Sequence, residues 1–356
     1  MIEFAGTDAG SDSQPILVKG WAACRRSLST PDLVSDASRS GQAARPSSNF
    51  LLMDGELHHA IRRLVMSYLS RSHLRLVGEK LAEQCARLVD SMVGRSDVDL
   101  VADLAEPLVL EGIMAAIEVP ARHRPELDDL TRKMLGLLEP DLPVADRRRA
   151  VGAALRATML FERDGADGQA TGLHAALEEA AQAGVISTKL ARSTPVVMLH
   201  GGYENPLNQL GCLIAWAVEN PERFRELAAS APAQLFEEIL RLYSPLLRVA
   251  RWVASDSDAG GQPLKRGELV WVDLESANLD ERHFVAPDQI DLARKPGHLG
   301  FGYGRHLCLG AALARLEGQI LIQSLLSLPA DWLRDFKVEW RDGFVARGPA
   351  RIVKNR

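Results

Sequence analysis

The sequence predicts a mainly α-helical protein with a small β-rich lobe. Several stretches carry apolar residues at helical spacing, among them 74–93 and the segment that begins at Leu309. By contrast, QPLKRGELVWVDLESAN (262–278) has short alternating runs around a turn, which is typical of β-strands. Hydrophobic residues make up 46% of the 356 residues, which is ample for a large core. Helices are therefore expected to outnumber strands.

Composition indicates one globular domain. No Pro-, Gly- or Ser-rich linker divides the chain, so we expect a single domain at 15–356. Residues 1–14 are polar and are expected to form a disordered tail.

A net charge of −5 excludes a general nucleic-acid footprint. The first residues, MIEFAGTDAGSDSQP, lack a basic region followed by an apolar one, and no uncharged apolar run reaches about 18 residues, so neither a signal peptide nor a membrane anchor is expected. Four scattered cysteines fit a reducing cytoplasm.

The first half of the chain is expected to be mostly helical. A short strand and a helix are predicted from Ile16 onward, followed by a loop at 40–50. In the next predicted helix, 53–70, His58 and Arg62 lie four residues apart and share one face. Judged from these residues alone, that face is more often solvated surface than a binding site. Further helices are predicted at 74–93, 99–116, after the turn at 119–123, and within 142–187.

The segment 194–220 is expected to form one long helix with a disturbed middle. Thr194 is a plausible N-cap, Pro195 suits the first helical position, and Asn220 precedes a proline at the end. Pro206 cannot donate to the carbonyl of Gly202, so a kink or opening is predicted there. The middle is polar where a domain-crossing helix should be apolar, with His200, Tyr203, Glu204, Asn205, Asn208 and Gln209. This pattern indicates either a functional groove or a polar seam satisfied by neighbouring loops.

FGYGRHLCLG (301–310) places one cysteine, Cys308, in a glycine-rich loop at the start of a helix. The unpaired N–H groups and the dipole of that helix should lower the thiol pKa and favour the thiolate. Glycines in the loop allow a flat ligand to lie against the backbone. A lone thiolate lacks the partners of a structural zinc site, but it suits haem iron, whose porphyrin supplies four nitrogens. A buried structural cysteine is the alternative reading of the residues alone.

FGYGRHLCLG, followed by AALARLE, resembles the haem-binding loop of the cytochrome P450 family, in its soluble bacterial form. The resemblance runs from about Ile16 to the end and implies the cytochrome P450 fold with haem b (iron protoporphyrin IX) as cofactor. It implies Cys308 as the axial metal ligand. It further implies an ExxR pair, Glu238 and Arg241, and Arg294 as the residue that completes their buried network. The implied cofactor-binding residues are His58, Arg62, Gly201, Arg251, Phe301, Gly302, His306, Cys308 and Gly310.

Among these, four residues are implied to hold the haem propionates. His58 and Arg62 match the family's DPPEHxxxRR pattern, although Gly55, Glu56 and Leu57 depart from it. Arg251 and His306 match two further donors of the family. Buried carboxylates require such charged hydrogen-bond partners.

The resemblance assigns the catalytic role to Glu204 and Asn205. Glu204 matches the acid of the family's AGxET pattern, but Asn205 stands where the pattern has threonine. An amide does not readily exchange its donor and acceptor roles. We therefore expect protons to pass from Glu204 through ordered water or through a hydroxyl or carboxyl group of the substrate.

The function implied is that of a haem-thiolate monooxygenase acting on a small organic substrate, in a tailoring step of secondary-metabolite or antibiotic biosynthesis. The substrate is either free or tethered to a carrier protein, and the electron donors are ferredoxin and ferredoxin reductase. Arg62, Arg63, Arg71 and Arg75 are expected either to form a basic docking face for an acidic ferredoxin or to be solvated surface charge. Neither nucleic acid nor membrane is an expected partner. Two alternatives remain: an atypical enzyme of dehydration, rearrangement, oxidative coupling or peroxide-driven oxidation, and a non-catalytic haem-binding protein of the same fold.

Two further expectations concern the pocket. Residues 246–249 and the loop around Gly343 and Phe344 fall where family members line the substrate pocket. The chain also starts a few dozen residues later than the family, without a helix and a strand pair, so the channel is expected to be more open or to be covered by a partner. A wrongly assigned start codon is the competing explanation.

Overall fold

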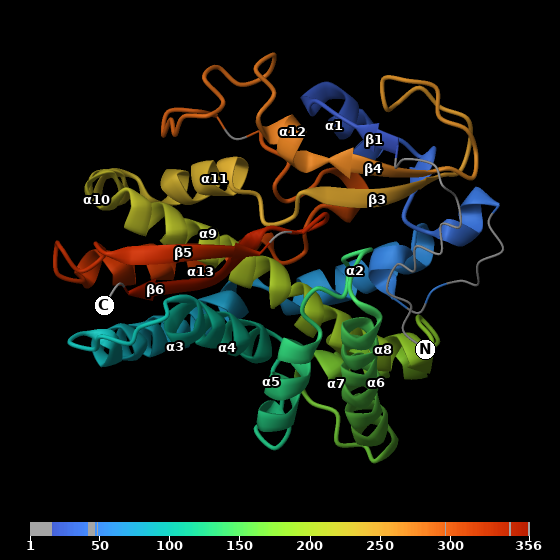
Figure 1. Cartoon of the computed structure of the whole chain (residues 1–356). Helices are drawn as coiled ribbons and strands as arrows, with labels where there is room; N and C mark the ends of the chain where they lie inside the picture. The colour runs from blue at the N-terminus through green and yellow to red at the C-terminus, as the bar shows by residue number, and fades with distance from the viewer. Residues whose placement is uncertain (1–15, 42–46, 48, 296, 342, 355–356) are drawn as a thin grey trace.

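The computed structural model describes residues 16–41, 47, 49–295, 297–341 and 343–354 (Figure 1). Helices dominate and the strands gather in two small sheets, which confirms the predicted fold class. The tail expected at 1–14 lies outside the described residues, and the division into one domain stays a prediction.

The helices are α1 (Trp21–Ser29), α2 (Glu56–Tyr68), α3 (Arg71–Met92), α4 (Glu106–Ala116), α5 (Arg124–Lys133), α6 (Val144–Ala166), α7 (Gly172–Gln182), α8 (Thr188–Gly201), α9 (Glu204–Glu219), α10 (Pro221–Ser230), α11 (Pro232–Leu242), α12 (Leu274–Asn278) and α13 (Ala311–Ser327). Short turns of other helix types are η1 (Ala37–Ser40), η2 (Phe50–Leu52), η3 (Val101–Ala105) and η4 (Gly304–His306). The strands are β1 (Ile16–Val18), β2 (Leu33–Val34), β3 (Arg248–Val253), β4 (Leu269–Asp273), β5 (Phe336–Arg341) and β6 (Gly348–Lys354).

The β-rich lobe is a four-stranded sheet of order β1-β4-β3-β2, with α1 and α12 beside it at the top of Figure 1. Strand β1 pairs parallel with β4, and the other pairs are antiparallel. Its apolar side chains make a small separate core with α1. The prediction of strands in 262–278 is right for β4 but wrong for the last five residues. They form α12, because the side chain of Asp273 caps the helix by accepting from the backbone N–H of Ser276.

The main core belongs to the helices. Helix α9 runs through the middle of the molecule and contacts α4, α8, α10, α11 and α13, while the β5–β6 hairpin packs on its side (Figure 1). All residues from Leu207 to Val218 are buried, so this helix forms the centre of the core. Within the described part of the chain, no helix is both long enough and apolar enough to cross a bilayer.

The predicted long helix at 194–220 is two helices in the structure, and its predicted start is wrong. Helix α8 begins at Thr188, where the side chain of Ser187 accepts from the N–H of Leu190 at 3.3 Å, and Pro195 lies inside it. The helix is interrupted at Gly202 and Tyr203, as Pro206 predicted. The end at Asn220 is also as predicted.

Candidate haem site

The loop 301–310 folds back on itself before α13. The N–H of Cys308 donates to the carbonyl of Phe301 at 2.9 Å, and the N–H of Gly302 donates to that of Leu299 at 2.8 Å. Gly304 has a φ of +72°, and a Cβ atom there would lie 2.5 Å from the carbonyl oxygen of Leu28. Only glycine allows this approach of the loop to α1. Gly310 is the N-cap of α13, so Cys308 lies at the helix start, as predicted.

Cys308 differs from the other three cysteines in its exposure. Its side chain is exposed, whereas Cys24, Cys85 and Cys212 are buried. Nevertheless, desolvation by the surrounding protein raises its pKa, against the lowering effects of the Gly310 N–H and the Arg62 and Arg315 charges. The thiol is therefore accessible to solvent although protein atoms surround most of it. The expectation of a lowered thiol pKa is wrong for the protein alone, because desolvation outweighs the helix N-terminus.

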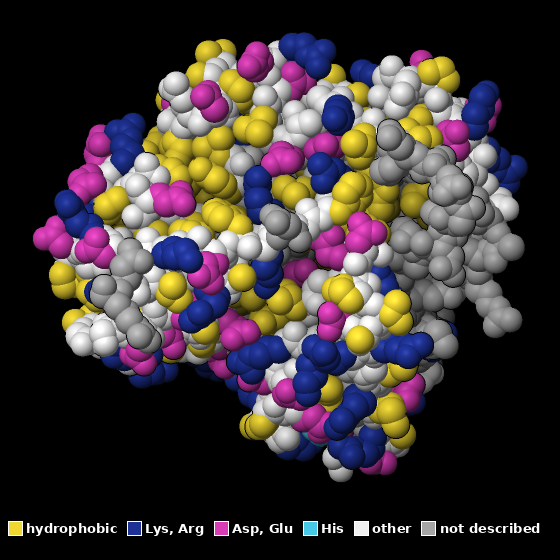
Figure 2. Space-filling model, viewed as in Figure 1, with side chains coloured by type: hydrophobic (Ala, Val, Ile, Leu, Met, Phe, Trp, Pro, Cys, Tyr) yellow, Lys and Arg dark blue, Asp and Glu magenta, His cyan; other side chains and the backbone are white. Residues whose placement is uncertain are grey.

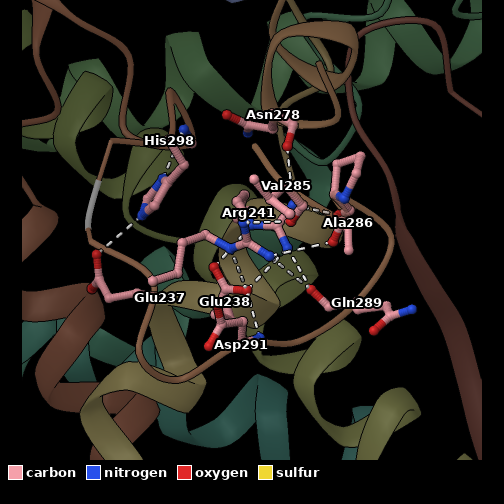
Figure 3. Close-up of polar contacts among 12 residues, drawn as sticks. Glu237, Glu238, Arg241, Asn278, Val285, Ala286, Gln289, Asp291 and His298 are labelled. Atoms are coloured by element: carbon pink, nitrogen blue, oxygen red, sulfur yellow. Dashed lines mark hydrogen bonds and ion pairs between the residues drawn. The ribbon is translucent and has the colours of Figure 1, made fainter. Parts of the chain in front are cut away.

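A buried ion network braces the chain beside this loop (Figure 3). Arg241 donates from Nε to Oε1 of Glu238 at 2.8 Å and from Nη2 to Oε2 at 3.0 Å. Arg294 adds a donation from Nε to Oε2 at 3.1 Å, as predicted. Burial alone would raise the pKa of Glu238, but these hydrogen bonds lower it. Further guanidinium donations from Arg241 reach the carbonyls of Asn278, Pro287 and Gln289. The network therefore fixes the segment 278–291 that leads to the cysteine loop.

A second network, which sequence reasoning missed, joins α11 to α13. Arg315 donates from Nε and Nη2 to the two carboxylate oxygens of Glu237 at 2.7 and 3.0 Å, and Nε2 of His298 lies 3.0 Å from Oε2. Burial would raise the pKa of Glu237, but hydrogen bonds from His298 and Arg315 lower it to about 2. The guanidinium of Arg315 also lies 4.5 Å from the centre of the Phe301 ring. The available signal was the second glutamate of FEEILR, next to Glu238.

Asp54 ties the cysteine loop to the chain before α2. Its Oδ1 accepts from Nε of Arg305 at 2.9 Å and lies 3.1 Å from Nε2 of His306. The N–H groups of Ser35 and Asp36 donate to Oδ2. Although burial would raise its pKa, these partners lower it far below the ordinary value. Because Nε2 of His306 is engaged, a propionate would have to bind this histidine through Nδ1.

Two residues predicted to hold propionates leave polar groups without acidic partners. His58 is 1% exposed, and its Nδ1 has no hydrogen-bond partner among the described residues. Burial lowers the pKa of His58 to about 3, so the ring is neutral. Burial also lowers the pKa of Arg251 to about 10, and its Nη1 donates to the carbonyl of Ala250. An orphaned imidazole nitrogen and a desolvated guanidinium both suit buried carboxylates.

Gly201 and Arg62 are two further residues predicted to bind the cofactor. A Cβ atom at Gly201 would meet no other atom within 4 Å, so this face of α8 borders open space. Arg62 donates from Nη2 to the carbonyl of Leu307 at 2.7 Å, so it contacts the cysteine loop directly. Its role toward a propionate stays a prediction. The lone thiol of Cys308, the donors of His58, Arg251 and Arg62, and the open helix face at Gly201 together fit a haem group.

The helix break holds a buried acid, Glu204, which is 6% exposed. Its Oε1 accepts from the N–H of Gly136, and its Oε2 lies 3.2 Å from Nε2 of His200. His200 is one turn earlier on α8, so the two side chains meet across the break. Asn205, the other predicted catalytic residue, is half-buried in the first turn of α9. Sequence reasoning noted His200 only as part of a polar stretch.

Comparison with known proteins agrees with this geometry. The family model for cytochrome P450 matches residues 233–328. The chain is 30% identical to the nocardicin C N-oxygenase of Nocardia uniformis subsp. tsuyamanensis over 329 residues, which cover 87% of this chain and 79% of the relative.

Solved structures share the fold. CalO2 superposes with a TM-score of 0.83 at 24% identity, over 94% of this chain and 89% of its own. P450BioI, solved in complex with an acyl carrier protein that carries hexadec-9Z-enoic acid, superposes with a TM-score of 0.80 at 23% identity, over 94% and 90%. Since the match to the nocardicin C N-oxygenase covers most of both chains, this chain belongs to the cytochrome P450 family.

Proposed function

We propose that this cytochrome P450 monooxygenase oxidises a small organic molecule in a tailoring step of secondary metabolism, such as antibiotic biosynthesis. The family binds haem b, which supplies the activation of oxygen when it is bound. The observation that carries the proposal is a lone thiol on a loop braced by one buried and one half-buried ion network, in a protein whose central helix breaks at a buried acid. The nocardicin relative supports the biosynthetic setting.

Within this proposal, the chain's own residues divide the work of holding the cofactor. Cys308 would supply the thiolate ligand. His58, Arg62, Arg251 and His306 would bind the propionates, because His58 stacks on His306 and the charges of Arg62 and Arg251 act on these two histidines. Phe301, Gly302, Gly310 and Gly201 would lie against the ring, since glycines permit the closest approach of a flat group.

Glu204 delivers protons in this proposal. Oxygen activation consumes protons, and Nε2 of His200 is close enough to Oε2 of Glu204 for exchange. From Glu204 the path continues through ordered water or through a hydroxyl or carboxyl group of the substrate. Asn205 orients the water or the substrate, because its amide donates and accepts but does not relay.

A carrier-tethered substrate is compatible with the surface. P450BioI was solved with a carrier protein. In this chain, Figure 2 shows Lys and Arg side chains, interspersed with acidic ones, over the region of α5 and α6. Exposed arginines on α6 are Arg148, Arg149, Arg156 and Arg163. Basic side chains suit an acidic carrier, and they would make its docking dependent on salt.

Ferredoxin and ferredoxin reductase are the proposed electron donors, with a revised docking face. Arg62 contacts the cysteine loop, and Arg75 pairs with Glu79 at 2.5 Å. Arg63 and Arg71 are exposed and carry no ion pair among the described residues. These two arginines are therefore the better candidates for contact with an acidic ferredoxin.

The proton path is tested by Glu204→Gln, with Glu219→Gln at the far end of α9 as the matched control. Once a substrate has been found by its spectral shift and product analysis, we expect Glu204→Gln to slow turnover by about 10²-fold and to divert electrons to peroxide. Asn205→Thr and the control should keep most of the product. Wild-type rate and coupling in Glu204→Gln would refute the relay and favour peroxide-driven or non-oxygenating chemistry.

A further inference from the structure

The break between α8 and α9 is opened by a proline, but a proline alone does not fix its geometry. Pro206 has no N–H for the carbonyl of Gly202, so the chain loses a helical hydrogen bond there. Such a loss permits a bend without setting the direction in which the next helix leaves. Tyr203, the N-cap residue of α9, uses its hydroxyl for a distant residue and not for capping this helix.

The phenol of Tyr203 binds a carboxylate on α4. The tyrosine is 2% exposed, and its hydroxyl donates to Oε1 of Glu106, the first residue of α4, at 2.5 Å. Nε of Arg132 on α5 lies 3.2 Å from the same oxygen. Burial and the hydrogen bond to Glu106 raise the pKa of Tyr203, so the phenol stays protonated and acts as the donor. Because the acceptor is ionised, this hydrogen bond is stronger than one between neutral groups.

Helix α4 supports the break at a second point. A Cβ atom at Gly202 would lie 2.4 Å from Cδ1 of Ile113, so the glycine gives α4 room to pack against the break. Glu106 and Ile113 are seven residues apart, about two helical turns, and therefore share one face of α4. That face meets the break with one polar contact, to Tyr203, and one apolar contact, to Gly202.

The anchored tyrosine is the immediate neighbour of Glu204. The N–H of Tyr203 donates to the carbonyl of His200 at 3.2 Å, and its carbonyl accepts from the N–H of Leu207 at 2.9 Å. Tyr203 is thus bonded to the last turn of α8, which carries His200, and to the first turn of α9, which carries Glu204. A shift of its ring would change the distance between Nε2 of His200 and Oε2 of Glu204, which is 3.2 Å.

We propose that Tyr203 is a positioning residue for Glu204: its hydroxyl, held by Glu106, sets the angle of the break and keeps the Glu204 carboxylate beside His200. The catalytic meaning of this inference rests on the proposed function, in which Glu204 delivers protons. The anchor itself rests only on the contacts of the phenol. Arg132 belongs to the same device, because its charge stabilises the half-buried carboxylate of Glu106.

A conservative change isolates the hydroxyl. Tyr203→Phe keeps the buried ring and removes only the group that binds Glu106. Tyr68→Phe is the matched control, because it removes a phenol hydrogen bond to Glu118 at the end of α2. Amide hydrogen exchange on the haem-loaded enzyme should become about tenfold faster at 202–207 in Tyr203→Phe, which is the effect expected from loss of a hydrogen bond to a charged group. Tyr68→Phe should leave exchange at 202–207 unchanged.

Replacements of Glu106 provide a rescue test. Glu106→Gln retains a carbonyl oxygen that accepts from the phenol, so exchange at 202–207 should stay within about threefold of the wild type. Glu106→Leu offers no acceptor and should match Tyr203→Phe. Equal exchange in the two Glu106 variants would contradict the role of Glu106 as the acceptor that holds Tyr203.

Carbon monoxide serves as the probe of positioning. The infrared C–O stretching band of the reduced carbon monoxide complex responds to polar groups beside the bound gas. Tyr203→Phe should shift this band in the same direction as Glu204→Gln, because both changes alter the carboxylate at the break. Tyr68→Phe should leave the band at its wild-type frequency.

Unchanged exchange at 202–207 in Tyr203→Phe would overturn the anchor, and so would an equal effect in Tyr68→Phe. If Glu204→Gln shifts the C–O band and Tyr203→Phe does not, Tyr203 has only a structural role and does not position Glu204. An unchanged band in Glu204→Gln would count instead against the proposed proton path, while exchange at 202–207 still decides the anchor without substrate or turnover. Failure of this inference is therefore distinguishable from failure of the proposed function.

Discussion

The cysteine loop and the helix break are held in opposite ways. Beside the loop, Glu238 and Glu237 each bind an arginine through both oxygens and one further side chain, Arg294 or His298, through one oxygen. At the break, Glu204 has one backbone donor, which comes from the α5–α6 connector, and one histidine. The side that presents the thiol is therefore rigid and redundantly bonded. The side assigned to proton delivery depends on few contacts, so its chemistry can change without loss of the fold.

The largest expected effect comes from breaking the rigid side. Arg241 is 1% exposed and Glu238 5% exposed, so Glu238→Gln leaves two buried guanidinium groups without their anion. Loss of one partner of a buried pair costs about 3–5 kcal/mol. We expect a fall of that size in the free energy of unfolding by urea, together with weak haem retention. As a control, Glu226→Gln, which removes an exposed pair with Arg223, should cost at most about 1 kcal/mol. Equal free energies of unfolding for the two variants would show that the Glu238 network contributes no more to stability than an exposed ion pair.

The second network predicts a pH dependence. The pKa of Glu237 falls from an ordinary 4.5 to about 2 on folding. A carboxyl lowered in this way stabilises the fold fully above its unfolded pKa and loses that contribution as pH falls through the folded value. The stability due to Glu237, on the order of 3 kcal/mol, should therefore disappear between about pH 4.5 and pH 2.

The free energy of unfolding should therefore be measured across this pH window for Glu237→Gln and for the wild type. As pH falls, it should decrease less steeply in Glu237→Gln than in the wild type. As a matched control, Glu222→Gln removes an exposed partner of Arg334 and should leave the pH dependence of the unfolding free energy unchanged. Parallel curves for Glu237→Gln and the wild type would show that another carboxyl governs this window.

Much of the cysteine side was predictable from sequence, because its determinants are local. The spacing of FGYGRHLCLG and the ExxR pair appear directly in the chain, and Pro206 announces the helix break. The start of α8 was not predictable: Thr194 and Pro195 make a plausible N-terminus, but burial of 190–200 favours helix through the proline. The direction of the Cys308 pKa shift was not predictable from sequence, because the desolvation that raises this pKa depends on atoms brought around the thiol by folding. The contact of Glu139 was not predictable either, because the backbone N–H groups that its carboxylate binds lie more than 200 residues away in the sequence.

The smallest expected effect concerns the outer surface near the cysteine loop, where half-buried Arg62 contacts the loop and Arg63 is exposed. Arg63→Ala should slow reduction by a cognate ferredoxin a few-fold, about 2- to 5-fold, and weaken its salt dependence. Arg75→Ala removes a charge already paired with Glu79, so it should have less effect. Stopped-flow reduction at several salt concentrations checks both. Identical rates in the two variants would remove Arg63 from the docking face.

The identity of the thiol ligand is tested most directly by the spectrum of the reduced carbon monoxide complex. Wild-type enzyme and Cys85→Ala, a change at a buried core cysteine, should both show the red-shifted Soret band of a thiolate-bound haem. Cys308→Ser should lack this band while it keeps the folded helical core. Retention of the red-shifted band in Cys308→Ser would contradict the assignment of Cys308 as the axial ligand.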